Sequence, residues 1–313
     1  LGFVRSTSDG KKTTQEATTF EYENAKVSRS TSDLLETGTP TDNLGRPSLY
    51  FRRSHVVTDG FQYNAAGQAK AYRRTTTVDD KTSEENVSGV TYNPQGRLLH
   101  SLTVFKETTV GVAVPHEYTV DLTVHEYDLA GRIARQTRIT VDRNKKITES
   151  NESPTFAEFS YDPQDRLTGQ EMQVREVSVT ASGDETDDYE KIQVVSQSFS
   201  YDEVGQVLTS RRIARRFEAD TDRTSLVDET SAYLYDMRGR AIETGITRVE
   251  ADYSGDQRMT SIADLAALTP LTNKVTSSVT IVPVSGFEKG RMVRFSSVNF
   301  EGDHIRLVRT GTE

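Results

Sequence analysis

Histidine is the residue type in this sequence that most directly suggests metal or acid–base chemistry. The chain has five histidines and no cysteine, which excludes disulfides and thiolate metal sites. None of the histidines lies in an HExxH pattern, and the nine-residue interval between His116 and His125 is not a typical ligand spacing. We therefore expect solvated or packed histidines at His55, His100, His116, His125 and His304.

Acidic residues gather in three short stretches, which raises the question of a calcium site. They are Asp79–Asp80, Glu84–Glu85 and Asp184–Asp188. Calcium needs about six to eight oxygen ligands from a defined loop, and no D-x-D-x-D-G pattern occurs. A weak surface ion at 184–188 stays open as an alternative, but we expect solvated loop charge.

Basic residues recur at similar distances after a repeated tyrosine that is described below. One interpretation is a cationic stripe that faces a polyanion, and the other is cross-strand pairing with the many acidic residues. The net charge of −9 favours pairing and disfavours nucleic-acid binding. The positions are Arg73, Arg74, Lys106, Arg135, Arg138, Arg175, Arg211, Arg212 and Arg248.

No motif of nucleophilic or phosphate-transfer catalysis is present. The chain has no GxSxG elbow, and Gly286–Gly290 is not followed by a Walker lysine. We expect no catalytic residue, no cofactor and no metal, and hence a protein that is not an enzyme. Asn86-Val87-Ser88 and Asn151-Glu152-Ser153 match the N-glycosylation pattern, which matters only in a secretory pathway.

A phrase that begins with tyrosine returns along the chain. It reads Tyr-Asp-Leu-Ala-Gly-Arg-Ile at 127–133, and weaker copies include one near Thr41–Arg46. A repeat at a roughly fixed period indicates an array of similar supersecondary units. The repeat residues that we expect to shape these units are Tyr22, Tyr63, Gly67, Tyr92, Gly96, Tyr127, Asp128, Gly131, Tyr161, Asp162, Tyr201, Asp202, Gly205, Tyr235, Asp236 and Gly239.

Each copy predicts a strand, a tight turn and a second strand. Asp or Asn at the start of the turn can accept a bond from the backbone two residues on, and glycine at the fifth position supplies a positive φ. Pro94 and Pro163 stand where a type I turn needs φ near −65°. A type I turn followed by a left-handed glycine is a three-residue hairpin loop with a bulge. Asp165 replaces the glycine in one copy, and Asp tolerates that conformation.

Residues on both sides of the turn predict cross-strand contacts. A large side chain usually stands two positions before the tyrosine, as Phe199 does before Tyr201, which places both on one face of a strand. We expect the tyrosines to stack from hairpin to hairpin. Aliphatic partners on the returning strand are Leu98, Ile133, Leu167 and Val207.

The repeat length predicts long strands. Successive tyrosines from Tyr63 to Tyr235 are 29, 35, 34, 40 and 34 residues apart. Two strands and two turns in each interval leave about 12–15 residues per strand, against about five or six in typical strands. The far-end turns are expected to vary in length and to offer binding loops, at Val78–Asn86, Thr109–Pro115, Asp142–Lys146, Ala181–Tyr189 and Ala219–Ser225.

The Tyr-Asp-x-x-Gly-Arg phrase resembles the YD-repeat, or Rhs-repeat, family over about residues 20–250. The spacing of the copies here is longer than in that family. The resemblance implies a long, spiralling antiparallel sheet built from hairpins. Some members of the family form hollow shells around a toxin, and others are large extracellular domains of adhesion proteins.

Composition agrees with a sheet that is wetted over much of its surface. Only 34% of the residues are apolar, and no run of 18 apolar residues exists that would predict a membrane span. The regular aromatic and valine spacing argues against disorder. The chain opens with Leu1 and shows no signal-peptide pattern, so we expect a piece cut or processed from a larger protein.

We predict an all-β fold, a repeat array of long antiparallel β-hairpins that forms an extended, twisted or spiralling sheet, with partial closure left open as an alternative. Residues 1–19 are a strand or a tail, 20–250 are the hairpin repeats, and 251–313 are a divergent repeat or capping region. A short helix is expected at Ser261–Leu268, with Ser261 as N-cap. Val298–Leu307 reads as a degenerate copy of the repeat.

The expected function is that of a non-catalytic structural segment of an extracellular or cell-surface wall, shell or fibre. Its partners would be neighbouring repeats or copies of the same chain that pair through edge strands. One alternative is an adhesion module that recognises glycans or a protein through variable loops, or through aromatic residues such as Tyr50, Phe51 and Tyr72. Another is a shell segment that encloses a toxin cargo. Neither nucleic acid nor membrane insertion is expected.

Overall fold

The computed structural model describes residues 1–8, 12–39, 49–79, 81–112, 114–180, 182–282, 287–288, 291–292, 294–301 and 304–312. The fold is all-β and confirms the predicted array of long antiparallel hairpins. The chain forms two compact units. The first comprises Leu1–Pro40, Leu49–Glu152 and Glu176–Glu190, and the second comprises Thr41–Ser48, Ser153–Arg175 and Lys191–Glu313.

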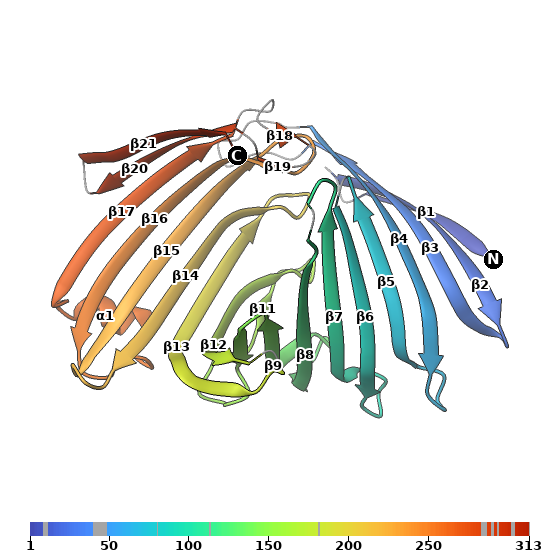
Figure 1. Ribbon diagram of the computed structural model, residues 1–313, viewed down its shortest axis with the longest axis horizontal. Helices are drawn as coiled ribbons and strands as arrows, with labels where there is room; N and C mark the ends of the chain where they lie inside the picture. The colour runs from blue at the N-terminus through green and yellow to red at the C-terminus, as the bar shows by residue number, and fades with distance from the viewer. Residues whose placement is uncertain are drawn as a thin grey trace. The chain divides into compact units, whose positions relative to one another are not determined.

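In the first unit the strands lie side by side in chain order, and each pairs antiparallel with the next (Figure 1). Within residues 1–19, for which a strand or a tail was open, residues 2–8 form a strand opposite residues 13–19. The strands are β1 (Gly2–Ser8), β2 (Lys12–Glu23), β3 (Lys26–Gly38), β4 (Tyr50–Tyr63), β5 (Ala69–Val78), β6 (Lys81–Tyr92), β7 (Leu98–Thr109), β8 (His116–Tyr127), β9 (Ile133–Asp142) and β10 (Lys145–Ser150).

The second unit repeats this arrangement, again with antiparallel neighbours in chain order. Its main strands are the C-terminal part of β13 (Glu185–Tyr201), β14 (Val207–Glu218), β15 (Arg223–Tyr235), β16 (Ala241–Ser254), β17 (Thr272–Ile281), β20 (Arg294–Glu301) and β21 (His304–Thr312). Shorter pairs are β11 (Ser160–Tyr161) with β12 (Leu167–Val179), and β18 (Phe287–Glu288) with β19 (Arg291–Met292). Strand β16 runs through residue 250, where the capping region was expected to begin.

Two far-end loops are shorter than predicted, because their charged residues continue the strands. Val78 pairs with Lys81, so Glu84, Glu85 and Asn86 belong to β6. Likewise the acidic residues 185–188 open β13, which leaves only 180–184 as a loop. Cross-strand pairing of the backbone outweighs the low strand propensity of these residues.

One predicted strand is interrupted. The segment before Tyr161 was expected to be a full strand, but β10 ends at Ser150 and only two residues of β11 remain. Asn151 replaces the backbone ladder with its side chain, since its Oδ1 accepts from Gln136 N at 2.8 Å and its Nδ2 donates to Ala134 O at 3.0 Å. Pro154, which has no N–H to donate, follows within the irregular stretch.

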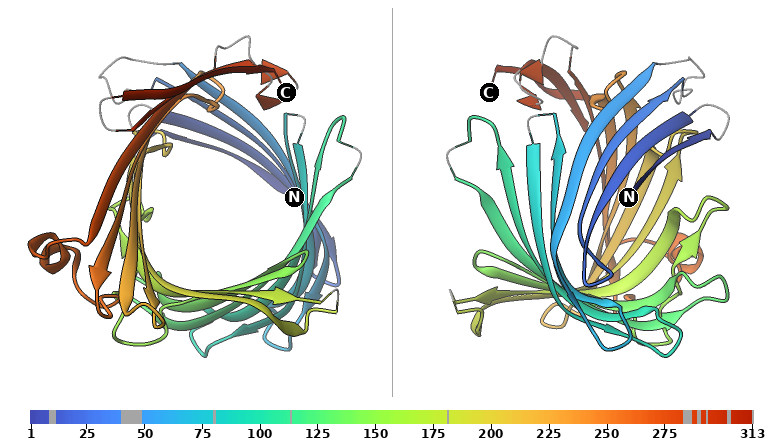
Figure 2. Two further views of the ribbon diagram at one scale, coloured as in Figure 1. Left: turned by 60° about the vertical axis from the view of Figure 1, so that its left-hand side comes forward. Right: turned by 90° about the vertical axis from the view of Figure 1, so that its right-hand side faces the viewer.

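The predicted short helix is present as α1 (Ile262–Ala267), capped by Ser261, whose hydroxyl accepts from Asp264 N at 3.1 Å. Leu265 packs on Ile213 and Leu226, and Tyr253 completes the cluster. The helix therefore lies against one face of the orange strands of the second unit (Figure 2). No described helix is long and apolar enough to cross a membrane.

Candidate functional site

Six of the repeated turns have the same backbone geometry. At Asp128, the backbone N–H donates to Arg132 O at 2.8 Å, and Gly131 N donates to Asp128 O at 3.0 Å. The turns that begin at Asn64, Asn93, Asp162, Asp202 and Asp236 have the same two bonds. This is the predicted three-residue loop, a type I turn closed by a left-handed residue.

The fifth position of each turn is left-handed, which explains its glycine. The φ angles are +81° at Gly67, +79° at Gly96, +88° at Gly131, +89° at Gly205 and +74° at Gly239. Asp165 takes φ +60° in the one copy that lacks glycine. The repeat therefore requires glycine for its conformation, with Asp as a strained substitute.

The turn carboxylate holds the loop from inside. Asp128 Oδ1 accepts from Arg132 N at 2.8 Å, while Oδ2 accepts from Arg132 Nε at 2.7 Å. These donors, first the backbone N–H and then the guanidinium, hold the pKa of Asp128 below its usual value. Asp202 faces Gln206 instead of an arginine, and burial raises its pKa. The same turn therefore stabilises the charged form of the carboxylate at Asp128 and destabilises it at Asp202.

The hairpin at Tyr22 differs from the other copies. Its turn has two residues, Asn24 and Ala25, with φ of +51° and +62°, and Glu23 pairs with Lys26. The weak copy near Thr41–Arg46 lies outside the described residues. Val298–Leu307 is confirmed as a hairpin, because the β20–β21 register shifts at Phe300 just as the other hairpins shift at their tyrosine.

Five of the repeat tyrosines bond their hairpin to the one before it. Tyr92 Oη donates to Ala69 O at 2.6 Å, and Tyr201 Oη donates to Leu167 O at 2.6 Å. We call these bonds the tyrosine–carbonyl links. The others join Tyr63 to Val27 O, Tyr127 to Leu98 O and Tyr235 to Val207 O.

The expected ring stacking between hairpins takes a different form. The aromatic neighbours of the repeat tyrosines belong to the same hairpin, as Phe61 does at 5.8 Å from Tyr63. Between hairpins, a cation from the preceding turn covers the ring. Arg97 lies 5.3 Å from the Tyr127 centroid, Arg166 lies 4.8 Å from Tyr201, and Lys26 lies 5.1 Å from Tyr63.

These covering cations were missed as functional residues, although the sequence contains a signal. Arginine stands five positions after the tyrosine in four copies, at Arg97, Arg132, Arg166 and Arg240. Arg166 also donates to Asp202 O at 2.9 Å, so it touches the next turn directly. A cation over an aromatic face contributes about 0.5–1 kcal/mol at exposed sites.

Burial of the link tyrosines changes their titration. Desolvation raises the pKa of Tyr63, Tyr92, Tyr127 and Tyr201 above the usual value of tyrosine. At Tyr235 desolvation, with smaller contributions from Tyr233 and Asp202, raises the pKa to about 12. The linked state therefore requires protonated phenols.

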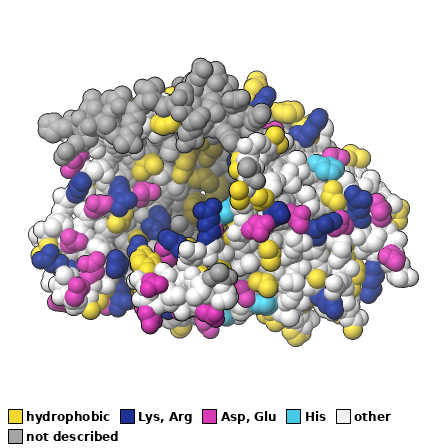
Figure 3. Space-filling view, viewed as in Figure 1, with side chains coloured by type: hydrophobic (Ala, Val, Ile, Leu, Met, Phe, Trp, Pro, Cys, Tyr) yellow, Lys and Arg dark blue, Asp and Glu magenta, His cyan; other side chains and the backbone are white. Residues whose placement is uncertain are grey.

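Six of the nine recurring basic residues form ion pairs across strands, as the second of the two interpretations expected. Charges of both signs are interspersed over the described surface in Figure 3. Exposed pairs of this kind are worth about 0–1 kcal/mol each, so they set register and solubility more than stability. The N–O distances are 3.0 Å for Arg73–Asp59, 3.5 Å for Arg74–Glu85, 3.2 Å for Lys106–Glu117, 3.2 Å for Arg135–Glu126, 2.6 Å for Arg211–Asp228 and 3.9 Å for Arg248–Glu229.

The histidines of the first unit also face carboxylates. His55 lies 2.9 Å from Asp33, and His100 lies 2.8 Å from Asp121. The hydrogen bond to Gly89 O, with the Asp121 carboxylate, raises the pKa of His100. Within the described residues, no three His, Asp or Glu side chains converge as metal ligands.

A buried arginine holds the α1 segment on the sheet. The Arg215 side chain is 2% exposed and lies 2.6 Å from Glu171 Oε1. Its Nη1 donates to Thr260 O at 2.6 Å, which joins β14 to the loop before α1. The sequence pattern did not distinguish Arg215 from the exposed Arg216 beside it.

The structure separates the two glycosylation patterns. Asn151 is fully buried, and its side chain is used in the backbone bonds described above. Asn86 is exposed on β6, where its Nδ2 donates to Glu84 at 3.0 Å. In the folded protein, the Asn86 side chain is therefore accessible for glycosylation, whereas the Asn151 side chain is not.

Tyr50 and Phe51, two of the aromatic residues suggested for a glycan-binding row, do not share one face of the sheet. Tyr50 is 6% exposed and donates to Glu36 at 3.0 Å, while its neighbour Phe51 is 46% exposed. Adjacent residues of a strand point to opposite faces. Tyr50 and Phe51 therefore cannot belong to one binding surface.

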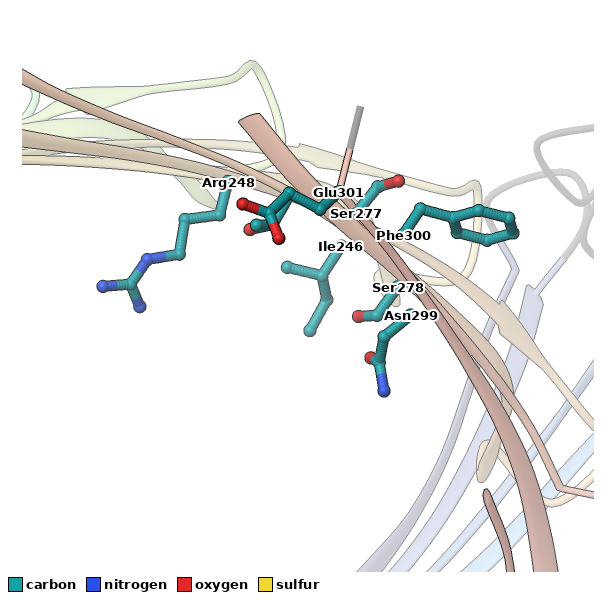
Figure 4. A pocket seen from close by; sticks show the side chains of 8 residues that line it. Ile246, Arg248, Ser277, Ser278, Asn299, Phe300 and Glu301 are labelled. Carbon is teal, nitrogen blue, oxygen red and sulfur yellow. The ribbon is translucent and has the colours of Figure 1, made fainter. Parts of the chain in front are cut away.

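A depression of about 230 Å³ lies on β16, β17 and β20. Figure 4 shows Arg248, Ile246 and Asn299 on one side of the ribbon and Phe300 on the other. Arg248 is already paired with Glu250 at 2.6 Å, and its second acid, Glu229, is 3.9 Å away. Glu301, the other charged residue of the lining, lies 3.7 Å from Lys274, so both charges of the depression are already paired.

No protein-family model matches this sequence, and no curated protein sequence is significantly similar to it.

Proposed function

We propose that this chain is a non-catalytic structural segment that builds an extracellular or cell-surface β-sheet wall of the YD-repeat type. The tyrosine–carbonyl links support this most directly. In each link the tyrosine hydroxyl donates its hydrogen bond to the neighbouring hairpin, so this donor is not available to a ligand. Residues that recur in such a lattice serve cohesion of the array rather than chemistry.

The links add cohesion that backbone pairing alone lacks. A buried hydrogen bond contributes about 0.5–1.5 kcal/mol, and the covering cation adds to it. Because Arg166 contacts both Tyr201 and Asp202 O, one hairpin cannot shift without disturbing the next turn. The resulting sheet resists local sliding, which a wall or fibre requires.

Extension of the sheet would proceed through an edge strand. In the part of the chain that the structure describes, β1 pairs only with β2. Phe3 and Val4 on β1 are 43% and 82% exposed. An open edge strand with a single charged residue, Arg5, favours pairing with another strand. The partner in this proposal is another copy of the chain or a neighbouring segment of repeats.

Electron microscopy of the purified protein across a concentration series tests this proposal. We expect fibres or ribbons that lengthen with concentration, and a Val4→Lys variant that shortens them because a lysine on the edge opposes pairing. Val114→Lys is the matched control, since Val114 is 76% exposed in the β7–β8 loop. Discrete particles at every concentration would contradict self-assembly, and hollow ones would favour the toxin-enclosing shell.

A further inference from the structure

Strand β6 of the first unit has a bulge three residues before its repeat tyrosine, Tyr92. Between Ser88 and Thr91, β6 has two residues where the facing strand β7 has one. Gly89 lies in this bulge with φ +62°, a left-handed conformation that suits glycine. A bulge of this kind takes backbone groups of its strand out of the regular ladder and leaves them for other partners.

His100 of β7 lies beside the bulge and uses both nitrogens of its ring. Nδ1 lies 3.0 Å from Gly89 O on β6, and Nε2 lies 2.8 Å from Asp121 Oδ1 on β8. Both partners are acceptors, because neither a carbonyl oxygen nor an ionised carboxylate has a hydrogen to donate. A neutral imidazole has one N–H, so it bonds one of these partners and turns a lone pair toward the other. The two contacts together therefore require the imidazolium.

The charged ring connects two successive hairpins. Strands β6 and β7 form the hairpin that turns at Tyr92, whereas β8 belongs to the next hairpin, which turns at Tyr127. The tyrosine–carbonyl link from Tyr127 to Leu98 O joins the same two hairpins, two residues before His100 in β7. His100 therefore adds to this link a second contact, which depends on the protonation of its ring.

Two titratable groups of β8 lie on the same side of the sheet as His100, and among the described residues none faces it from β6. Asp121 is in contact, and His125 follows four residues later. His125 Nε2 lies 2.8 Å from the Thr137 hydroxyl, which can donate or accept, so either protonation state of His125 keeps this bond. On β6 the residue opposite His100 is the uncharged Thr91. Asp121 is therefore the charge that acts on His100.

The surroundings of His100 favour its charged form near neutral pH. The bond to Gly89 O raises the pKa of His100 most, and the Asp121 carboxylate adds to the rise, although desolvation acts in the opposite direction. The contacts then contribute stability that is complete below the pKa of an unfolded histidine, about 6.5. This stability is lost as the pH rises through the higher pKa of the folded state.

We propose that His100 is a pH-sensitive clasp of the first unit, which holds the β6 bulge to β8 when its ring is charged and releases one of the two contacts when its ring is neutral. The clasp acts within one folded chain, so it does not depend on the proposed sheet extension. A matching bulge without a clasp lies in β4. Gly60 takes φ +65° there, three residues before Tyr63, and Ala71 stands at the position of His100.

Titration of the histidine rings by NMR, together with hydrogen exchange of the full chain, tests the proposal. We expect His100 to titrate above about 6.5, and its pKa to fall in Asp121→Asn, which keeps an oxygen acceptor but removes the charge. Amides around the Gly89 bulge should exchange about two- to fivefold more slowly at about pH 6 than at about pH 8, after correction for the intrinsic rate. This difference should disappear in His100→Gln, and the Gly60 bulge should not show it.

His55→Gln is the matched control variant. His55 bonds Asp33 through Nδ1 alone, at 2.9 Å, so a neutral ring keeps this contact, and the variant should leave the pH difference at the Gly89 bulge unchanged.

Three results would overturn the proposal. They are a His100 pKa at or below about 6.5, a pH difference that persists in His100→Gln, and an equal difference at the Gly60 bulge. The His100 side chain is 36% exposed, so its replacement removes a surface charge. If this variant fails to fold, the titration of His100 in the unmodified chain and in Asp121→Asn still decides the question.

Discussion

Replacing the turn glycines by alanine measures how strongly one hairpin depends on the next. Gly67 and Gly131 occupy the same left-handed position in different copies. A Cβ at Gly67 would meet nothing within 4 Å, whereas one at Gly131 would lie 3.0 Å from Arg97 Nη2. The backbone cost is therefore common to both substitutions, and only Gly131→Ala disturbs the covering cation.

The expected magnitudes follow from these two contributions. Left-handed alanine costs about 1–2 kcal/mol, and the smaller entropy of the unfolded chain returns about 0.4–1 kcal/mol. Gly67→Ala should therefore lower the free energy of unfolding by about 1 kcal/mol. Gly131→Ala also displaces Arg97 from its place 5.3 Å over Tyr127. This adds about 0.5–1 kcal/mol, the worth of an exposed cation–π contact.

Urea unfolding followed by circular dichroism measures both variants, and hydrogen exchange at the turn amides supplies a local measure. A double-mutant cycle with Arg97→Ala isolates the contact. In that background, Gly131→Ala should cost no more than Gly67→Ala. Two results would refute the coupling between successive turns. The first is an equal loss of unfolding free energy in Gly67→Ala and Gly131→Ala when Arg97 is present. The second is a loss in Gly131→Ala that stays the same when Arg97 is replaced by alanine.

Three further predictions concern single groups. Asp202→Asn should stabilise the protein at pH 7, because burial disfavours its charge, whereas Asp128→Asn should destabilise it; thermal melting of both variants checks the sign. The protonated Tyr235 phenol stabilises the fold below pH 10. This contribution of about 2–3 kcal/mol is lost as the pH rises from 10 through its folded pKa of about 12, and Tyr235→Phe should flatten the alkaline unfolding curve. Arg215→Met should lower the free energy of unfolding by about 2–4 kcal/mol, since it leaves the buried contacts unpaired, while Arg216→Met should change it by less than about 1 kcal/mol. Equal melting temperatures for the two arginine variants would contradict the conclusion that Arg215 holds the α1 segment on the sheet.

The recurring phrase determined most of the fold. Turn conformation depends on a few adjacent residues, so Asp or Asn at the start and Gly131 at the fifth position are readable without tertiary information. The interval between tyrosines likewise predicted strands of about the observed length, 10 to 14 residues in β4 to β9. The Ser261 cap is local in the same sense.

The sequence failed where a side chain acts on a distant part of the chain. Asn151 resembles a glycosylation site, but its burial follows from bonds to Ala134 and Gln136 on another strand. Glu185 resembles loop charge, but the register places it in β13. The competition between local propensity and cross-strand pairing is decided by partners that the local pattern does not show.

The sequence by itself determined that this protein is an array of hairpins with uniform turns, because those choices are local. Only the tertiary structure decided which groups meet. In the folded chain the tyrosine hydroxyls bond carbonyls of the preceding hairpin, and Arg97 lies next to Gly131. His116 likewise contacts Asp142, which is 26 residues away in the sequence. These contacts depend on register and on sheet twist, which fix the positions of side chains that are remote in the chain.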